Sequence, residues 1–478
     1  MAHAIGIPQT RRASALPALC HDADGKRCID MRAIAVLALP LVLNSTVQAV
    51  LNLTDTWFIG RLSTAATAAI AAVHWLALLA LFLIGGVAMG VQTLVAQAYG
   101  AGRYRRTSQI AWMGLWASVL TIPAFALTIA FGPAMIRGFG LGLDVEAFAI
   151  QFWVPRMIGG PLAAALWAAV AYFNGIGRTR VPLVIGLVVL VSNAILNEIF
   201  IFRFGWGMAG AAWATTAAEL IGVAMAIQAI LRLEPERFRA HLTWHPKMRR
   251  IVALIALGLP MAMTPCADLA AAALFQLMQV QVGIVDGAAT QIVTIFTAIA
   301  YMPGIGLALA GTTLVGQAIG AGDRDWAERL GNRIIAIVAC YMGGIGLVIA
   351  LTGDWVVPLF VNAADPRAAE VIALCSSLLW LAAAYQFFDG VNFASSFCLR
   401  GAGDARVPAL IVLACGLLLF LPLTHLLTFA PGEGWFDWAP GYGLGAVGGW
   451  CAILVYVVAI GTALWFRWRN GAWRRIRL

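Results

Sequence analysis

Long apolar stretches recur along almost the whole chain, and they restrict its fold more than any other feature. Each is long enough to cross a bilayer as a helix, because about 20 residues span the hydrocarbon core. Twelve spans are predicted, at 33–60, 66–97, 107–131, 147–173, 181–202, 207–231, 250–282, 288–317, 326–352, 367–398, 407–428 and 443–466. With 62% hydrophobic and 11% charged residues, the chain is too apolar for an ordinary soluble domain. We therefore expect an all-α integral membrane protein.

The chain carries 31 Lys and Arg against 22 Asp and Glu, and the placement of the basic residues explains the excess. Most of them lie in the terminal segments and in alternate loops, whereas the opposite side holds Arg61, Arg137, Arg203 and Arg367. Because basic loops stay in the cytoplasm, this bias predicts that both termini are cytoplasmic. We attribute the charge to topology in a membrane, expected to be the bacterial inner (plasma) membrane, and not to a nucleic-acid partner.

Three hydrophilic segments are expected on the cytoplasmic side: an N-terminal tail at 1–32, a linker at 232–249 and a C-terminal tail at 467–478. Residues 1–31 lack the apolar core of a signal peptide, so we expect a disordered tail, and Met31 competes with Met1 as the start of the chain. The cysteines and histidines show no metal-ligand spacing and no catalytic signature is present. Neither an enzyme nor a resident cofactor is therefore expected.

Two pairs of similar motifs show an internal repeat. TLVAQAYGAG at 93–102 returns as TLVGQAIGAG at 313–322, and GIGRTRVP at 175–182 returns as GAGDARVP at 401–408. We interpret the glycine-rich parts as turns that link adjacent helices, since they lack the Lys-Ser/Thr of a phosphate-binding loop.

The repeat divides the spans into two sets of six. An even number brings both sets into the membrane from the same side, so the repeat is parallel, with an axis near the membrane normal. We predict an N-lobe of helices 1–6 at 33–231 and a C-lobe of helices 7–12 at 250–466 around a central cavity. This arrangement is typical of transporters that rock two bundles about a central site.

Polar side chains at membrane depth are costly and usually functional, so they indicate where a site lies. In the first span, four of them recur every three or four residues and share one helix face: Asn44, Gln48, Asn52 and Asp55. Such a face must look toward protein or a water-filled cavity, since lipid cannot satisfy it. Asn193 and Asn197 of the fifth span are one turn apart, and we expect them to share the cavity of Asp55.

A second polar patch is predicted in the C-lobe. Asp268 follows Thr264 by one turn, and the tenth span carries four polar residues at similar spacing: Tyr385, Asp389, Asn392 and Ser396. In the sequence repeat, Asp268 is equivalent to Gln48, and Asp55 is equivalent to Phe275. Since acids needed only for the scaffold should occur in both copies, this asymmetry favours a functional role. Two further charged residues fit either a local ion pair or a place near the membrane boundary: Arg156 and Glu219.

Taken in order, these motifs resemble the multidrug and toxic compound extrusion (MATE) transporters along nearly the whole chain, from about Arg32 to Arg467. The resemblance rests on Pro40 before DTWFIGRL, on AQAYGAG and GQAIGAG, on NAILN before FIF, and on YQFFD before LRGAGDARVP. It implies twelve helices in two parallel six-helix lobes. The NorM-type branch is the nearer match, because both lobes have a polar patch.

The resemblance also implies roles for residues at matching positions. Asp55 resembles the first-helix acid of an N-lobe cation-coupling site, with four polar residues around it: Gln48, Asn193, Asn197 and Thr215. The position of Asn197 is an aspartate in some members, so this chain departs from them there. In the C-lobe, Asp268 and Asp389 resemble the acids of helices 7 and 10, with Tyr385 one turn before Asp389.

We therefore expect a secondary active multidrug efflux antiporter that exports amphipathic organic cations or drugs in exchange for inward H⁺ or Na⁺. The ion stays open, since desolvation favours a protonated carboxylate, whereas oxygens of Asp268 and Asp389 would suit Na⁺. Pro40 is expected to let the first helix bend as the charge of Asp55 changes. The chain is expected to be a monomer in membrane lipid, without an obligate protein partner. The alternative is a lipid-linked oligosaccharide flippase of related fold, whose phosphate calls for cavity cations, of which only Arg156 is visible.

Overall fold

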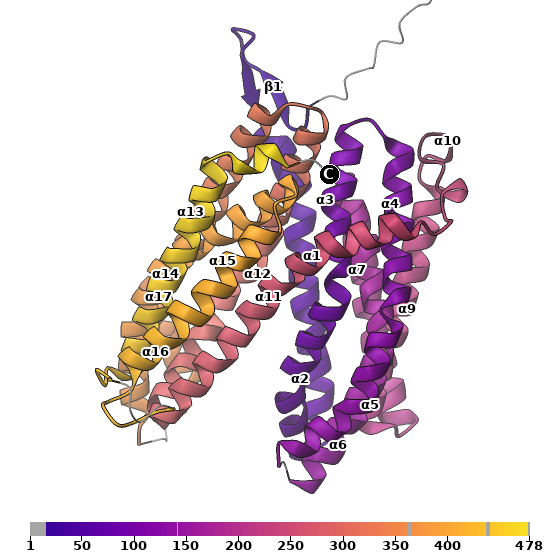
Figure 1. The fold of residues 1–478 in the computed structure, drawn as a ribbon. Coiled ribbons are helices and arrows are strands. Elements are labelled where there is room, and N and C mark those ends of the chain that lie inside the picture. The colour runs from indigo at the N-terminus through magenta and orange to yellow at the C-terminus, as the bar shows by residue number, and fades with distance from the viewer. Residues whose placement is uncertain (1–15, 141, 362–365, 436–439, 477–478) are drawn as a thin grey trace, which may run out of the picture.

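A computed structural model gives the fold and describes residues 16–140, 142–361, 366–435 and 440–476. Nearly all of the described chain is helical, which confirms the predicted all-α class. The helices form two groups, one from each half of the sequence, which lean together at the upper end of Figure 1 and diverge toward its lower end. We call α1 to α9 the N-lobe and α11 to α17 the C-lobe.

The first half of the chain contains a short hairpin followed by the helices of the N-lobe. Their bounds are β1 Leu19–His21, β2 Arg27–Ile29, α1 Met31–Gly60, α2 Thr64–Gly85, η1 Gly86–Ala88, α3 Met89–Gly100, α4 Tyr104–Leu120, α5 Ile122–Gly138, α6 Leu143–Ile158, α7 Gly160–Gly175, α8 Arg180–Asn197, the π-helix η2 Glu198–Arg203 and α9 Gly207–Arg232.

The second half begins with two short helices in the linker and continues with longer helices. Their bounds are α10 Pro235–Phe238, η3 Ala240–Leu242, α11 Met248–Val282, α12 Ile284–Gly320, α13 Arg324–Val356, η4 Val357–Phe360, α14 Ala368–Ala402, α15 Arg406–Cys415, the π-helix η5 Gly416–Phe420, α16 Leu421–Thr428, α17 Gly445–Arg469 and η6 Ala472–Arg475.

The membrane spans agree with the predicted number. In the described part of the chain, 11 helical segments are long and apolar enough to cross a membrane, and the bent pair α6 and α7 raises the number to 12. That pair corresponds to the span predicted at 147–173, and it bends by 48°. Pro155 and Pro161 flank the break at Gly159, and proline weakens a helix there because it lacks an N–H. By contrast, α1 continues as one helix through Pro40. Asp30 caps its N-terminus, because its side chain accepts hydrogen bonds from two backbone N–H groups.

The expectation of a disordered N-terminal tail is wrong for residues 16–30; residues 1–15 lie outside the described chain. β1 and β2 pair antiparallel, and a disulfide joins Cys20 to Cys28. The indole Nε1 of Trp326 on α13 donates to the carbonyl of Pro17 at 2.9 Å. The strand pairing and the disulfide hold the segment together, and the bond from Trp326 connects it to the C-lobe, although its sequence has no apolar periodicity.

The linker before α11 is attached in a related way, to the opposite lobe. The indole Nε1 groups of Trp112 and Trp116 on α4 donate to the carbonyls of Ala240 and Trp244 at 3.0 and 2.7 Å. The segment before the first helix of each lobe therefore binds a helix of the other lobe. The predicted C-terminal tail is also partly ordered, because the ring of Trp473 in η6 stacks on Trp468 at 4.7 Å.

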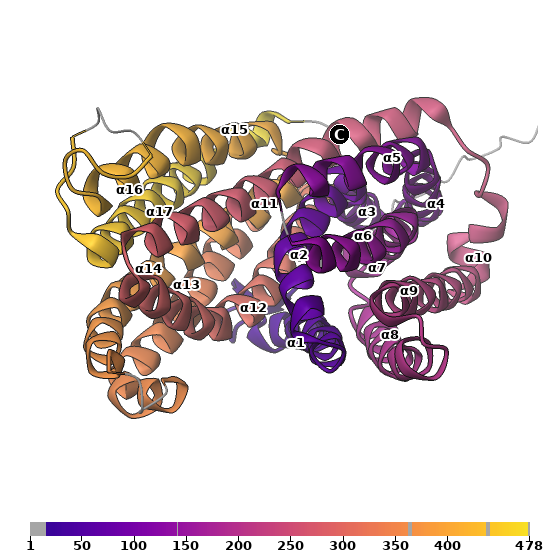
Figure 2. The same cartoon turned by 90° about the horizontal axis from the view of Figure 1, so that it is seen from below.

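The first helix of each lobe lies at the interface between the lobes. α1 packs on α8 of its own lobe and on α12 of the other, and α11 packs on α15 of its own lobe and on η1 and α3 of the other. Figure 2 shows α1 and α12 side by side between the two groups of helices. Polar side chains on α1 and α11 are therefore close to the boundary between the lobes.

Candidate ion-coupling sites

The N-lobe brings Asp55 together with polar residues from two other helices. The amide Nδ2 of Asn197 on α8 donates to Asp55 Oδ1 at 2.7 Å, and the hydroxyl of Thr215 on α9 donates to Asp55 Oδ2 at 3.2 Å. Asn193 joins the same cluster, because its Oδ1 accepts from Asn197 at 3.1 Å and its Nδ2 donates to Thr215 at 3.2 Å. The structure thus assembles four of the five N-lobe residues that the resemblance implied.

One oxygen of this cluster lacks a donor. Asn197 is fully buried, and its Oδ1 has no hydrogen-bond partner among the described residues. A buried carbonyl oxygen without a donor is costly, so this atom is suited to a proton donor or a cation next to Asp55.

The rest of the stripe on α1 lies outside the hydrogen-bonded cluster. Gln48 is about two turns before Asp55, and its exposed side chain makes no hydrogen bond within the described part of the chain. Asn52 is exposed as well, whereas Asn44 faces Gly186 of α8. The polar stripe therefore continues from Asp55 along the surface of α1 toward the other end of the helix.

Arg156 and Glu219, which sequence alone left open, form an ion pair beside this cluster. The guanidinium of Arg156 at the end of α6 is 3.1 Å from the carboxylate of Glu219 on α9, and their side chains are 13% and 10% exposed. Glu219 lies one turn after Thr215, and Arg156 also interacts electrostatically with Asp55. The N-lobe cluster thus contains two carboxylates and one guanidinium.

The C-lobe holds the second cluster, around Asp389 on α14. Asp389 is 4% exposed, and both of its oxygens accept hydrogen bonds, one from the hydroxyl of Tyr385 at 3.2 Å and one from the amide of Asn392 at 3.1 Å. These donors come from the preceding and following turns of the same helix. The spacing of Tyr385, Asp389 and Asn392 therefore places a hydrogen-bond donor on each side of the carboxylate.

Asp268 on α11 lies close enough to Asp389 for the two charges to interact. Three further residues around the acids were missed as site residues: Tyr301 on α12, Arg400 on α14 and Tyr456 on α17. Arg400 interacts electrostatically with Asp268, and its guanidinium lies 4.6 Å from the ring centre of Phe397. Its position in LRGAG suggested a loop cation, but α14 continues to Ala402 and keeps it in the helix.

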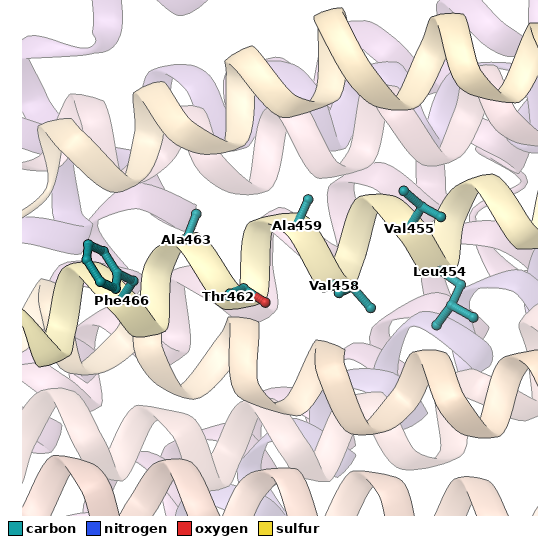
Figure 3. Close-up of a pocket in the computed structure, with 7 residues that line it drawn as sticks. All are labelled: Leu454, Val455, Val458, Ala459, Thr462, Ala463 and Phe466. Carbon is teal, nitrogen blue, oxygen red and sulfur yellow. The ribbon is translucent and has the colours of Figure 1, made fainter.

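A groove on α17 is lined by none of the residues of the two clusters. The groove has a volume of about 770 Å³ and is lined by apolar residues and one hydroxyl: Leu454, Val455, Val458, Ala459, Thr462, Ala463 and Phe466. Figure 3 shows these side chains on successive turns of that one helix. The lining has no charge that could discriminate an ion or a charged substrate, so we assign no coupling role to this groove.

Comparisons with known proteins agree with the fold and the motifs. The model of the MatE family matches residues 40–199 and 260–426, which together exceed half of the chain. The chain belongs to the MatE family. The resemblance to MATE transporters is therefore confirmed, and MatE members are transporters rather than enzymes.

Curated relatives of this MatE chain support the same class. It is 28% identical over 455 residues to a probable multidrug resistance protein NorM of Rhizobium meliloti, covering 92% of both proteins. It is 29% identical over 454 residues to a protein of the same name from Pseudomonas aeruginosa, covering 92% of this chain and 90% of that one. These names support multidrug efflux transport as the function of the MatE chain.

Solved structures share the fold of this MatE chain at low sequence identity. A MATE crystal structure in the straight conformation matches with a TM-score of 0.80 at 19% identity, covering 93% of this chain and 96% of the other. The outward-facing conformation of a multidrug resistance MATE family transporter matches with a TM-score of 0.78 at 19% identity and the same coverage. Both confirm a membrane transporter fold.

Proposed function

We propose that this MatE chain is a secondary active antiporter that exports amphipathic organic cations in exchange for an inward cation, H⁺ or Na⁺. The observation that carries the proposal is the pair of interacting carboxylates in the C-lobe, Asp268 and Asp389. Two like charges that interact at membrane depth repel, unless a cation neutralises one of them. The pair is therefore suited to hold a coupling ion in one state and a substrate cation in another.

Oxygen atoms around the C-lobe acids suit either ion. The hydroxyl of Tyr385 and the amide of Asn392 already bond Asp389, and Tyr301 and Tyr456 add hydroxyls near both acids. Carboxylate and hydroxyl oxygens are ligands for hard cations, and a proton on either acid would serve the same neutralising role. Within the described residues no three His, Cys, Asp or Glu side chains gather as a metal site, so a Na⁺ ion would rely on these neutral oxygens.

The N-lobe cluster is proposed as a second place where a cation acts. Asp55 has two bonded oxygens and stands next to the unpartnered Oδ1 of Asn197. Bending of α1 at Pro40 would change the distance from Asp55 to its partners on α8 and α9, which links the charge of Asp55 to movement of α1.

The flippase alternative is less well supported by the charges. Arg156, the cation that could bind a lipid phosphate, is paired with Glu219. Arg400, near the end of α14, interacts electrostatically with Asp268. A phosphate in either place would compete with a carboxylate that is already present.

The test measures efflux of ethidium from proteoliposomes under an imposed Na⁺ or pH gradient. We expect Asp268→Asn and Asp389→Asn to reduce gradient-driven efflux by at least about tenfold, because a charge interaction of a few kcal/mol exceeds the ~1.4 kcal/mol of a tenfold change. The gradient that drives wild-type efflux identifies the ion. Asp55→Asn tests the N-lobe site in the same assay.

Asp286→Asn is the matched control, because Asp286 is a C-lobe carboxylate outside the cluster that accepts from the backbone N–H of Ala446 at 2.7 Å. It should transport like the wild type. Unchanged efflux in the three acid variants would contradict the coupling role. If no gradient drives efflux from the wild-type protein, the flippase becomes the better hypothesis.

A further inference from the structure

The repeated motif TLVxQA joins the two lobes at the end of the molecule that carries the loops α3–α4 and α12–α13, which we call the basic end. From the N-lobe, Thr93 of α3 donates its hydroxyl to the carbonyl of Arg400 at 2.8 Å. Gln97, one turn later, donates its amide to the carbonyl of Gly401 at 3.0 Å. Both acceptors lie at the end of α14 in the C-lobe.

The C-lobe copy of the motif makes the reciprocal bonds. Thr313 of α12 donates its hydroxyl to the carbonyl of Asn174 at 2.9 Å, and Gln317 donates its amide to the carbonyl of Gly175 at 2.9 Å. These acceptors lie at the end of α7 in the N-lobe. The donors and the acceptors are each equivalent in the sequence repeat, so the four bonds are related by the symmetry of the two lobes.

Water cannot easily replace these bonds in the observed state. Thr93 and Thr313 are fully buried and Gln317 is 8% exposed. Between them α3 and α12 touch through their backbones: a Cβ on Gly100 would lie 1.9 Å from the carbonyl oxygen of Gln317, and one on Gly320 would lie 2.0 Å from that of Gln97. A separation of the lobes at this end must break all four bonds.

One acceptor residue connects these bonds to the C-lobe acids. The backbone of Arg400 accepts from Thr93 of the opposite lobe, while its guanidinium interacts with Asp268. The equivalent residue in the N-lobe is Asn174, which accepts from Thr313 but has no charge. The repeat is therefore symmetric in its backbone bonds and asymmetric in the side chain that interacts with Asp268.

We propose that Thr93, Gln97, Thr313 and Gln317 form a latch that holds the lobes together at the basic end, and that Arg400 is the positioning residue through which the C-lobe acids act on it. The distribution of Lys and Arg assigns this end to the cytoplasm, so the latch holds the lobes together on the cytoplasmic side. The role of Arg400 rests on the proposed ion coupling, whereas the latch itself does not.

The latch is tested by measuring a distance across the basic end. Spin labels are attached at two exposed positions, Arg105→Cys and Arg324→Cys, in a background without native cysteines. Double electron–electron resonance between the labels then reports the separation of the lobes. We expect Thr93→Ala and Thr313→Ala each to raise the ratio of open to closed populations roughly fivefold, as the loss of one buried hydrogen bond predicts.

Thr312→Ala is the matched control. Its hydroxyl donates at 2.8 Å to the carbonyl of Phe397, a bond of the same kind that stays inside the C-lobe. It should leave the distance distribution unchanged. If Thr93→Ala and Thr313→Ala behave like Thr312→Ala, the latch proposal is overturned.

Arg400 is tested by Arg400→Asn, which introduces the side chain found at Asn174 and keeps the carbonyl that Thr93 binds. Without added ion, we expect the distance distribution of Arg400→Asn to stay as in the wild type. The change that Na⁺ or pH causes in the ratio of open to closed populations should be smaller by roughly fivefold or more, because one charge interaction is lost. Arg406→Asn, an exposed arginine on α15, is the control and should respond like the wild type.

The two parts of the proposal fail in different ways. A full ion response in Arg400→Asn would overturn the role of Arg400 and leave the latch. If no ion shifts the wild-type distribution, the proposed ion coupling fails together with the role of Arg400, whereas the comparison of Thr93→Ala with Thr312→Ala still decides the latch.

Discussion

The two lobes share their helices, their motifs and their cross-lobe bonds, but they place their charges at different positions. The N-lobe cluster contains Asp55, Glu219 and Arg156, from α1, α9 and α6. The C-lobe cluster contains Asp268, Asp389 and Arg400, from α11 and α14. Each cluster thus has two carboxylates and one guanidinium, although none of the six positions is occupied by a charge of the same sign in both copies of the repeat.

The difference lies in how the charges are paired. In the N-lobe, Arg156 is hydrogen-bonded to Glu219, which leaves Asp55 with neutral donors. In the C-lobe, the two acids interact electrostatically with each other, and Arg400 interacts with Asp268 from the end of α14. The two copies of the repeat therefore carry different clusters: the N-lobe cluster contains an ion pair, and the C-lobe cluster contains two interacting acids. We propose that ion and substrate compete most directly in the C-lobe cluster.

The largest effect is expected from breaking the N-lobe ion pair. Arg156→Ala should lower the free energy of unfolding by about 3 to 5 kcal/mol, because it leaves the carboxylate of Glu219 buried without its partner. The double variant Arg156→Met with Glu219→Leu should recover most of that loss. Thermal unfolding in detergent measures both, and equal stability of the single and double variants would show that the pair is not the cause.

Asn197→Asp should make the N-lobe resemble the C-lobe. It replaces the donor that lies 2.7 Å from Asp55 by a second carboxylate, and the two can be neutralised by one more cation in each cycle. One further charge per cycle is worth about 2.3 kcal/mol at 100 mV, so the reversal potential of transport should shift measurably in proteoliposomes. Asn197→Ala, which adds no charge, should keep the wild-type value. A value for Asn197→Asp that equals the control would mean that the N-lobe does not take up the ion.

Gly100→Ala and Gly320→Ala should have similar effects if the two lobes contribute equally to the interface. Each new methyl group would meet a backbone carbonyl at 1.9 or 2.0 Å, so the helices must shift, at a cost of about 1 to 3 kcal/mol. Gly138→Ala is the control, since a Cβ there has no neighbour within 4 Å. Thermal unfolding tests the symmetry, which is contradicted if only one of the two variants is destabilised.

The smallest effect is expected where the segments before α1 and α11 bind the opposite lobes. Trp326→Phe and Trp112→Phe each remove one indole donor, to Pro17 and to Ala240, and should each cost about 1 kcal/mol. Efflux should remain close to the wild-type rate. A much larger loss in one variant would show that the two attachments are not equivalent.

Much of the fold could be predicted because it follows from local properties of the chain. Apolar stretches predicted the spans, and the motif pairs predicted a repeat. Helical periodicity placed Asn193 and Asn197 on one helix face, and it placed Tyr385 and Asn392 on either side of Asp389, since residues three or four apart share a helix face. The resemblance to MATE transporters, and not periodicity, placed the two asparagines near Asp55. The break of the fourth span at Gly159 was missed, although two nearby prolines were a signal for it.

Other parts of the sites could not be predicted, because their partners are distant in sequence. The glycine-rich motifs were interpreted as turns, and Gly102 and Gly322 do adopt positive φ angles there. Nothing in either motif indicates, however, that Gln97 and Gln317 reach the opposite lobe. The pairing of Arg156 with Glu219 likewise depends on how α6 packs against α9.

The sequence by itself determined that the chain is a twelve-span helical membrane protein with an internal repeat and a few acids at membrane depth, because hydrophobicity and spacing are carried by each segment alone. Only the tertiary structure decided which charges meet, that residues 16–30 are ordered, and that the repeated Thr and Gln side chains join the lobes. Hydrogen bonds and ion pairs act over a few ångströms, so they depend on the packing of helices whose bonded residues are 63 to 307 positions apart in the sequence.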